Sequence, residues 1–416
     1  MHYLVTSVIP NMGEIDCGEL FCELRGGRES VTFRYSDDWL SRGYDLSPDM
    51  PVGPGTFFSP NGFDELRAFA DAMPDRWGRN LLRRDESRRA EAANLTPRTL
   101  FESDYLTGVA DVSRQGSIRL WDENGNALNA KRNAVPRVIE LPKLLDAADK
   151  AAEDLDADVR DLVDAGSSLG GARPKASVLD LDGSLCVCKL PRKDETDERD
   201  VCTWEHVTLE IARDAHIVVP RARLLRLGNR NALLTERFDR DAKGERIPYI
   251  SGMSAIEGND GGAYTLDALV DFIETNCEDP DHDCRELWKR ALLTCLVGNT
   301  DNHMRNYGFL RGEGGWRLSP QFDVNPTPWT HGMSLASGLD RGNYSADPDL
   351  AMSLRECFRV SAEEAERFCN DLLGSIAGWR RIARADGLPE RSVTAMSGCF
   401  DPAISWLECA SQLVRR

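Results

Sequence analysis

The sequence predicts an α+β fold, with a β-rich N-terminal half followed by a helical C-terminal half. In the first half, short runs of alternating apolar and polar residues are separated by glycine-containing turns, which is typical of strands and hairpins. From about residue 265 the apolar residues instead follow helical spacing. The length of 416 residues favours two to three domains, each long enough to bury a core.

The N-terminal 60 residues are expected to be rich in strands. Apolar residues alternate at 20–24 and at 31–35, on either side of the turn Arg25-Gly-Gly-Arg28, and this arrangement predicts a hairpin. Residues 63–95 follow helical spacing. The pair Thr96-Pro97 predicts a new helix, because Thr caps helices well and Pro fits the first helical position.

Periodicity also predicts the elements in the rest of the chain. The expected elements are a helix at 141–164 that runs into the acidic stretch 153–158, a glycine- and serine-rich loop at 165–172, strands at about 175–180 and 184–190, a helix at 205–215, a strand at 231–238, and mainly helices from 265 onward. Asp182-Gly183 is a strong signal for a tight turn between the two middle strands.

The composition limits the classes of function. Lys and Arg number 51 and Asp and Glu 69, which gives a formal net charge of −18. Such a chain repels phosphate, so direct binding to DNA is not expected, whereas a local nucleotide pocket and a basic protein partner are compatible with it. There is no run of 18 apolar residues and no signal-peptide pattern. We therefore expect a cytoplasmic protein without a membrane span, whose 12 scattered cysteines are reduced.

The most informative segment is a polar loop after an apolar helix, Gly298-Asn-Thr-Asp-Asn-His-Met-Arg-Asn-Tyr-Gly308. Asp301 and Asn306 are five residues apart, as are the catalytic Asp and the metal-binding Asn of the protein-kinase catalytic loop. Phosphoryl transfer needs a carboxylate that accepts the proton of the acceptor hydroxyl and a neutral oxygen ligand for Mg²⁺. Asp301 and Asn306 suit these two roles, but both residue types also favour plain turns, and the spacing alone leaves that alternative open.

A second carboxylate follows downstream. Asp323 ends a short predicted strand that begins at Trp316, 22 residues after Asp301. A carboxylate at this distance can share a magnesium ion with Asn306, as the second metal-binding Asp of kinases does. An ordinary turn before Val-Asn-Pro326 is the alternative.

A lysine on an apolar strand is a candidate phosphate ligand. Lys189 shares one strand face with Leu185 and Val187, and a buried ammonium group needs a charged partner. Phosphate oxygens fit, and so does Glu205 near the start of the next helix, which would form the Lys–Glu pair of kinases. A solvent-facing lysine on an edge strand is the alternative.

Two more segments fit a nucleotide. The loop Gly166-Ser-Ser-Leu-Gly-Gly-Ala-Arg-Pro-Lys175 is neither a Walker A nor a G-x-G-x-x-G pattern, but Gly170 and Gly171 can expose backbone N–H groups to phosphate beside Lys175. A plain surface loop is the alternative. The strand that ends in Thr235-Glu-Arg-Phe-Asp239 places Glu236 where a hinge between lobes would contact adenine.

The order of these segments is the order found in a protein kinase, and the chain resembles the HipA-type serine/threonine kinases, the toxins of HipAB-like toxin–antitoxin systems. The resemblance covers nearly the whole chain. It is carried by Phe33-Arg-Tyr35, Pro74-Asp-Arg-Trp-Gly-Arg-Asn-Leu-Leu82, Ser167-Ser-Leu-Gly-Gly-Ala-Arg-Pro-Lys175, Cys188-Lys-Leu-Pro191, Thr235-Glu-Arg-Phe-Asp239, the polar loop, and Leu318-Ser-Pro-Gln-Phe-Asp-Val-Asn-Pro326.

The resemblance implies a two-lobed protein-kinase-like fold that binds ATP and Mg²⁺. Its implied parts are a HipA-like N-terminal subdomain at 1–140, a β-rich ATP-binding core of the N-lobe at 141–240, and an all-helical C-terminal lobe with the catalytic loop at 241–416.

The resemblance also implies roles for single residues. Asp301 is the expected catalytic base, Asn306 and Asp323 the Mg²⁺ ligands, Lys189 a phosphate ligand, Glu236 and Phe238 the hinge residues at adenine, and His303 a support of the loop. Ser168 is the expected autophosphorylation site, with Ser167 as the alternative. A phosphate there adds nearly two negative charges beside Gly170 and Gly171, which would oppose ATP.

The expected partners are a helix-turn-helix antitoxin of the HipB type and a protein substrate, a translation component such as an aminoacyl-tRNA synthetase. DNA would be reached only through the antitoxin. Two alternatives stay open: an antitoxin-binding corepressor whose kinase activity is dispensable, and a kinase of small molecules.

Overall fold

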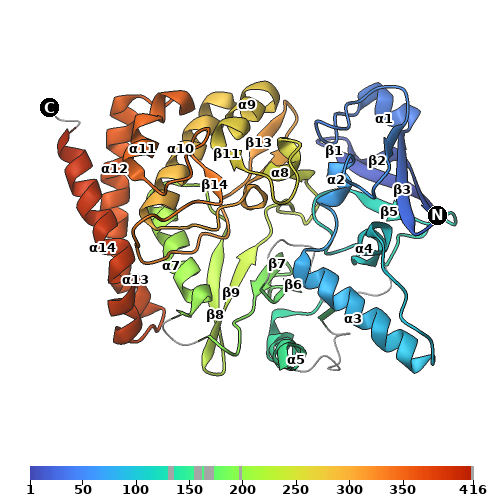
Figure 1. Ribbon diagram of the computed structural model, residues 1–416, viewed down its shortest axis with the longest axis horizontal. Coiled ribbons are helices and arrows are strands. Elements are labelled where there is room, and N and C mark those ends of the chain that lie inside the picture. The colour runs from blue at the N-terminus through green and yellow to red at the C-terminus, as the bar shows by residue number, and fades with distance from the viewer. Residues whose placement is uncertain (130–134, 154–161, 164–172, 196–198, 414–416) are drawn as a thin grey trace. The chain divides into compact units, whose positions relative to one another are not determined.

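The computed structural model describes residues 1–129, 135–153, 162–163, 173–195 and 199–413, and its chain divides into two compact units (Figure 1). The first unit comprises Met1–Lys193 and Glu236–Asn259, and the second comprises Asp194–Thr235 and Asp260–Arg416. The domain boundaries predicted near residues 140 and 240 stay predictions.

The first unit contains a five-stranded sheet of order β4-β3-β2-β1-β5 (Figure 1). Its elements are β1 (His2–Ile9), β2 (Gly13–Arg25), β3 (Arg28–Tyr35), α1 (Asp37–Arg42), β4 (Phe57–Ser59), α2 (Arg67–Ala70), α3 (Arg76–Ala92), α4 (Glu102–Gly108), β5 (Arg119–Trp121), the 3₁₀ helix η2 (Val138–Glu140), α5 (Leu141–Glu153), β6 (Lys175–Leu179), β7 (Leu185–Lys189), β10 (Tyr249–Ser251) and α8 (Gly252–Ala255).

The predicted N-terminal hairpin is confirmed. β2 and β3 pair antiparallel with Arg25 opposite Arg28. The two residues between them, Gly26 and Gly27, have φ values of +59° and +78°, the left-handed conformation that a tight hairpin turn needs and that glycine adopts without strain. The inward face of the hairpin buries Phe33, whose ring meets the ring of Phe69 at 5.1 Å and forms the core under the sheet.

The helices after this sheet differ partly from the prediction. The region 63–95 forms two helices, α2 and α3, and Asp75 caps α3 by accepting a hydrogen bond from the backbone N–H of Gly78 at 2.7 Å. The helix start predicted at Thr96-Pro97 is wrong. The next helix, α4, begins at Glu102, because Asp104 accepts the backbone N–H of Phe101 and thereby caps the helix five residues later than expected.

The middle hairpin is confirmed. β6 and β7 pair antiparallel, with Gly183 at φ +88° in the turn between them. The register places Lys175 directly opposite Lys189.

The second unit is mainly helical. Its elements are α7 (Val201–Asp214), β8 (Ala222–Leu227), β9 (Arg230–Glu236, whose last residue begins the second segment of the first unit), β11 (Tyr264–Thr265), α9 (Leu266–Asn276), α10 (Pro280–Leu296), η4 (Met304–Asn306), β12 (Gly308–Arg311), β13 (Trp316–Leu318), β14 (Ser337–Gly338), α11 (Pro348–Ser353), η5 (Arg355–Phe358), α12 (Ala362–Ile376), α13 (Trp379–Ala385) and α14 (Glu390–Leu413).

The expectation of an all-helical C-terminal lobe needs one correction, because the short strands β11 to β14 interrupt the helices. The hairpin of β12 and β13 follows the polar loop directly and is held by antiparallel pairing of Phe309 with Leu318. The helices pack through aromatic side chains: the ring of Trp379 in α13 lies 6.1 Å from Trp204 in α7 and 4.7 Å from Phe400 in α14.

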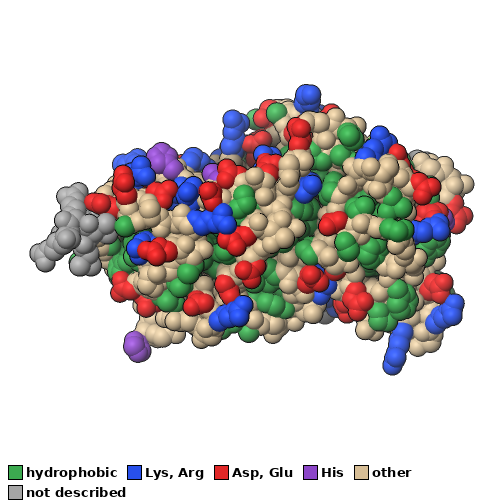
Figure 2. All heavy atoms as spheres, turned by 90° about the horizontal axis from the view of Figure 1, so that it is seen from above, with side chains coloured by type: hydrophobic (Ala, Val, Ile, Leu, Met, Phe, Trp, Pro, Cys, Tyr) green, Lys and Arg blue, Asp and Glu red, His purple; other side chains and the backbone are tan. Residues whose placement is uncertain are grey.

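On the face shown in Figure 2, acidic, basic and hydrophobic side chains lie among one another. In the part of the chain that the structure describes, no helix combines the length and the apolar character that a membrane crossing requires. All 12 cysteines are free thiols.

Candidate functional site

The polar loop of residues 298–308 begins where the chain leaves α10 in a tight turn. Gly298 has φ +61°, and a Cβ atom at this position would lie 2.7 Å from the carbonyl oxygen of Thr327. The backbone N–H of Thr327 in turn donates to the carbonyl of Val297 at 2.9 Å. The close approach fixes the start of the loop against the segment that follows Asp323, and only glycine permits it.

The structure brings Asp301 and Asn306 together. The side-chain amide of Asn306 donates from Nδ2 to the backbone carbonyl of Asp301 at 2.9 Å, and the backbone N–H of His303 donates to the same carbonyl at 2.9 Å. Because the amide of Asn306 uses its nitrogen in this bond, its oxygen can still act as an acceptor. Asp301 is exposed to solvent.

Buried neighbours hold the loop. Asn302 is 3% exposed and donates to the carbonyl of Ser337 at 3.3 Å and to the hydroxyl of Tyr307 at 3.4 Å. Burial raises the pKa of Tyr307 to about 12. His303 is half-buried, and its Nδ1 atom is buried without a hydrogen-bond partner among the described residues. Sequence reasoning did not assign Asn302 a role, because its position in the loop says nothing of its burial.

Asp323 is held in an unusual backbone conformation. Its φ is +59°, in the left-handed region that few residues other than glycine adopt. Its N–H donates to Oε1 of Glu205 at 3.1 Å, and its Oδ1 accepts from Nδ2 of Asn325 at 3.0 Å. The β12–β13 hairpin, closed by the N–H of Ser319 on the carbonyl of Gly308, connects this segment to the polar loop.

The residues of this part fit a magnesium ion. The Oδ1 atom of Asn325 is buried without a hydrogen-bond partner among the described residues, and Asn306 offers an amide oxygen. Among the described residues, no group of three or more His, Cys, Asp or Glu side chains could hold a metal by itself. Side-chain oxygens are the ligands that Mg²⁺ prefers; it takes one or two carboxylates and completes its shell with water and substrate phosphates.

The first unit contains the lysines of the predicted phosphate site. Lys175 and Lys189 lie opposite each other across β6 and β7, and they are only 5% and 8% exposed. Two buried ammonium groups in facing positions repel each other and are stabilised by anionic partners. Burial raises the pKa of Asp75 to about 7, while the charge of Lys175 acts in the opposite direction.

The hinge segment of residues 236–239 is fixed by two residues to which sequence reasoning gave no role, Arg237 and Asp239. Both are buried, and Nε of Arg237 donates to Oδ1 of Asp239 at 2.8 Å. Asp239 also accepts the N–H of Gly116 at 2.8 Å and Nη1 of Arg240 at 2.9 Å. Burial raises the pKa of Asp239, but the guanidinium groups of Arg237 and Arg240 and the N–H of Gly116 outweigh it and hold this pKa well below its usual range. The ring of Phe238 lies 6.1 Å from that of Tyr249.

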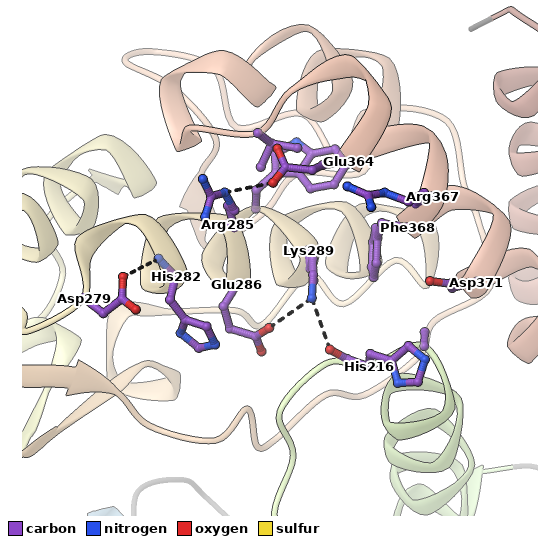
Figure 3. A pocket seen from close by; sticks show the side chains of 13 residues that line it. His216, Asp279, His282, Arg285, Glu286, Lys289, Glu364, Arg367, Phe368 and Asp371 are labelled. Atoms are coloured by element: carbon purple, nitrogen blue, oxygen red, sulfur yellow. Dashed lines mark hydrogen bonds and ion pairs between the residues drawn. The ribbon is translucent and has the colours of Figure 1, made fainter. Parts of the chain in front are cut away.

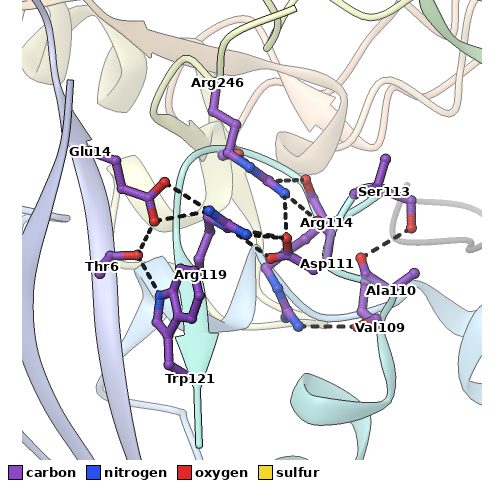
Figure 4. A network of polar contacts seen from close by, with 12 residues as sticks. Thr6, Glu14, Val109, Ala110, Asp111, Ser113, Arg114, Arg119, Trp121 and Arg246 are labelled. Carbon is purple, nitrogen blue, oxygen red and sulfur yellow. Dashed lines mark hydrogen bonds and ion pairs between the residues drawn. The ribbon is translucent and has the colours of Figure 1, made fainter. Parts of the chain in front are cut away.

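Arg237 of the hinge segment donates to the carbonyls of Ser113 and Arg114, which belong to a larger arginine cluster around the loop before β5. Figure 4 shows this cluster. The carboxylate of Asp111 forms ion pairs with Arg119 at 2.8 Å and with Arg246 at 3.5 Å. The buried Arg114 donates a hydrogen bond to the carbonyl of Leu106 at 2.7 Å. Burial lowers the pKa of Arg240 to about 9 and those of Arg114 and Arg246 to about 10. The cluster ties the hinge segment to the N-terminal sheet within the first unit.

The other predicted residues divide as follows. Glu236 ends β9, and the next N–H, of Arg237, donates to the carbonyl of Leu185 in β7 at 3.0 Å. Glu205 belongs to the second unit and Lys189 to the first, so their predicted pairing stays a prediction. Gly170, Gly171, Ser167 and Ser168 lie outside the described residues.

A separate cavity of about 530 Å³ lies in the second unit, between the end of α7, α10 and α12 (Figure 3). Lys289 spans it, with Nζ 3.2 Å from the carbonyl of His216 and 3.8 Å from the carboxylate of Glu286. None of the predicted site residues lines this cavity.

Comparison with known proteins gives two family matches. The profile of the HipA-like C-terminal domain matches residues 167–379, just over half of the chain, and that of the HipA N-terminal domain matches residues 12–97. A curated Haemophilus influenzae protein named "Putative kinase" is 28% identical over 142 residues, 30% of this chain. The match spans 41% of the length of that relative.

Among solved structures, the chain is similar to HipA in the complex of the Shewanella oneidensis MR-1 toxin–antitoxin system HipA, HipB and its operator DNA. The TM-score is 0.68 at 14% identity, and the match covers 99% of both chains. It is also similar to the Helicobacter pylori proinflammatory kinase CtkA, with a TM-score of 0.46 at 16% identity over 60% of this chain and 94% of that one. The first match confirms the expected two-lobed α+β fold.

Proposed function

The chain belongs to the HipA family, and we propose that it is an ATP- and Mg²⁺-dependent serine/threonine protein kinase, the toxin of a toxin–antitoxin pair. The observation that carries the proposal is the polar loop, in which the amide of Asn306 bonds the backbone of Asp301 at 2.9 Å. One loop thereby presents an exposed carboxylate and an amide oxygen, the pair that phosphoryl transfer requires.

Each residue has a step in this proposal. Asp301 accepts the proton of the substrate hydroxyl, and its exposure lets a protein substrate reach it. His303 supports the loop, while Asn306 and Asp323 hold the metal. Bound ATP and Mg²⁺ supply the phosphoryl group and neutralise part of its charge.

The first unit supplies the nucleotide contacts. Lys189 and Lys175 bring two buried positive charges to the phosphates, which would relieve their mutual repulsion. Gly170 and Gly171 contact the phosphates through backbone N–H groups, and Glu236 and Phe238 contact adenine at the hinge. Autophosphorylation of Ser168 or Ser167 would then place a second anion beside the phosphates and oppose ATP binding.

The proposed partner is a HipB-type helix-turn-helix antitoxin. The net charge of −18 favours a basic partner, and the Shewanella protein was solved together with HipB and operator DNA. DNA is reached through that partner. The proposed substrate is a translation component such as an aminoacyl-tRNA synthetase, and the proposed location is the cytoplasm.

Labelling with radioactive ATP and Mg²⁺ tests the kinase. We expect label on Ser168 or Ser167 in the wild type, none in Asp301→Ala, and full labelling in the control Asp271→Ala, which changes an exposed residue of α9. Equal labelling of Asp301→Ala would refute the assignment of the base. Label only in a dialysable product would instead indicate a small-molecule kinase, and growth inhibition that survives Asp323→Ala would indicate a corepressor.

A further inference from the structure

We propose that Glu205 is a positioning residue for Asp323, and that it acts as a hydrogen-bond acceptor for the backbone of the metal-binding segment and not through its charge. This inference rests on the function proposed above, in which Asp323 is a metal ligand. It differs from the role that the sequence suggests for Glu205, the ionic partner of Lys189, because it assigns the effect to a contact within the second unit.

The first observation is the burial of Glu205. Its side chain projects from α7 and the residue is only 2% exposed. A carboxylate removed from water needs hydrogen-bond donors in its place. Oε1 of Glu205 meets one, the backbone N–H of Asp323, at 3.1 Å.

The second observation is the backbone of Asp323. A φ of +59° is rare for a residue with a Cβ atom and persists only where the surroundings determine it. Glu205 fixes the N–H of this residue, and Asn325 fixes its carboxylate through Oδ1 at 3.0 Å. The N–H of Asn325 donates in turn to Oδ1 of the buried Asn299 at 3.3 Å, so the segment is also fastened to the polar loop.

The third observation is that α7 is anchored inside the second unit. Nδ1 of His206 lies 2.8 Å from Oδ2 of Asp386, and Nδ2 of Asn231 donates to Oγ1 of Thr203 at 2.8 Å. All of these residues belong to the second unit. The helix that carries Glu205 is therefore packed in the same unit as Asp323, and the contact can keep the metal-binding segment in place without help from the first unit.

The substitution Glu205→Gln separates the two roles. Glutamine keeps an oxygen acceptor at the same reach but loses the negative charge. It therefore preserves the bond to the N–H of Asp323 and abolishes any ion pair. Glu205→Ala removes both. Glu210→Ala, on the same helix, is the matched control, because the ionic partners of Glu210 are Arg213 and His206.

The experiment measures binding of Mn²⁺ with ATP by electron paramagnetic resonance, and binding of ATP in EDTA as the metal-free reference. Loss of a residue that orients a metal ligand costs about 10- to 100-fold in metal affinity. We expect Glu205→Ala to weaken Mn²⁺ binding by that factor, Glu205→Gln and Glu210→Ala to bind Mn²⁺ like the wild type, and metal-free ATP binding to stay unchanged in all three.

Two results would overturn the inference: wild-type Mn²⁺ affinity in Glu205→Ala, or a loss in Glu205→Gln as large as in Glu205→Ala. If Glu205→Ala does not fold, Glu205→Leu replaces it, because leucine also removes both the acceptor and the charge but fills more of the space; wild-type Mn²⁺ affinity in Glu205→Leu would overturn the inference. Absence of Mn²⁺–ATP binding in the folded wild type would refute the proposed function itself, and the inference with it.

Discussion

Asp239 is expected to be one of the most important residues for the stability of the first unit, and Asp239→Ala tests this. Asp239 is 3% exposed, and its carboxylate accepts from four N–H donors: Nε and Nη2 of Arg237, Nη1 of Arg240 and the backbone N–H of Gly116. Removal of the carboxylate leaves two buried guanidinium groups without their anion. Arg237 keeps its hydrogen bonds to the carbonyls of Ser113 and Arg114, but these neutral groups do not neutralise its positive charge.

The loss follows from the burial of the pair. Breaking a buried ion pair by removing one partner costs about 3–5 kcal/mol of unfolding free energy, because an uncompensated charge stays behind. For a folding unit of this size that corresponds to a fall in Tm of roughly 6–20 °C. The neighbouring arginines hold the pKa of Asp239 below its usual range, so its stabilisation is complete above an ordinary pKa of 3.8 and is lost as the pH falls further.

Scanning calorimetry and urea unfolding at pH 7 measure the effect on the full chain. Asp64→Asn is the control, because Asp64 is exposed in the same unit and a surface substitution changes stability by less than about 0.5 kcal/mol. If Asp239→Ala lowers the unfolding free energy by less than about 1 kcal/mol, the reasoning is refuted, because the two arginines would then not depend on this carboxylate for their stability in the fold. ATP binding of the variant shows whether the hinge segment moves as well.

Three further predictions concern separate elements. Burial raises the pKa of Asp75 to about 7, so the wild type should lose stability relative to Asp75→Asn as the pH rises from 5 to 8 in urea unfolding; Asn keeps the cap of α3. Gly298→Ala should lower the unfolding free energy by at least about 1–2 kcal/mol, whereas Gly374→Ala in α12, with open space around it, should not lower it. Ser361→Ala should cost about 1 kcal/mol by calorimetry, because it removes the capping box of α12, and an unchanged Tm would contradict this.

Local patterns predicted much of the fold because short-range physics determines those elements. The hairpins at Arg25-Gly-Gly-Arg28 and Asp182-Gly183 need left-handed turn residues, and glycine marks them in the sequence. The start of α4 was missed for the opposite reason. Thr96-Pro97 is a good helix start, but the helix begins at Glu102, where Asp104 caps Phe101 and pairs with Arg98, contacts that depend on the fold of the loop.

In the candidate site, too, local features could be predicted better than contacts between separate segments. The spacing of five residues singled out Asp301 and Asn306 as a pair, and the contact between them lies within one loop. Strand alternation left a solvent-facing Lys189 open as an alternative, and the burial of Lys189 excludes it. The opposition of Lys175 and Lys189 depends on the strand register, which the tight turn between the strands fixes.

The residues that hold the site in place were not predictable, because their partners are distant in the sequence. Arg237 and Asp239 look like surface charges in a strand pattern, and their burial follows only from the loop at Ser113–Gly116, more than 120 residues earlier. Glu205 meets Asp323 across 118 residues, and what it binds is a backbone N–H, which no side-chain pattern records. Sequence motifs therefore identify the groups that do the chemistry, whereas the groups that orient them are found only from the contacts of the folded chain.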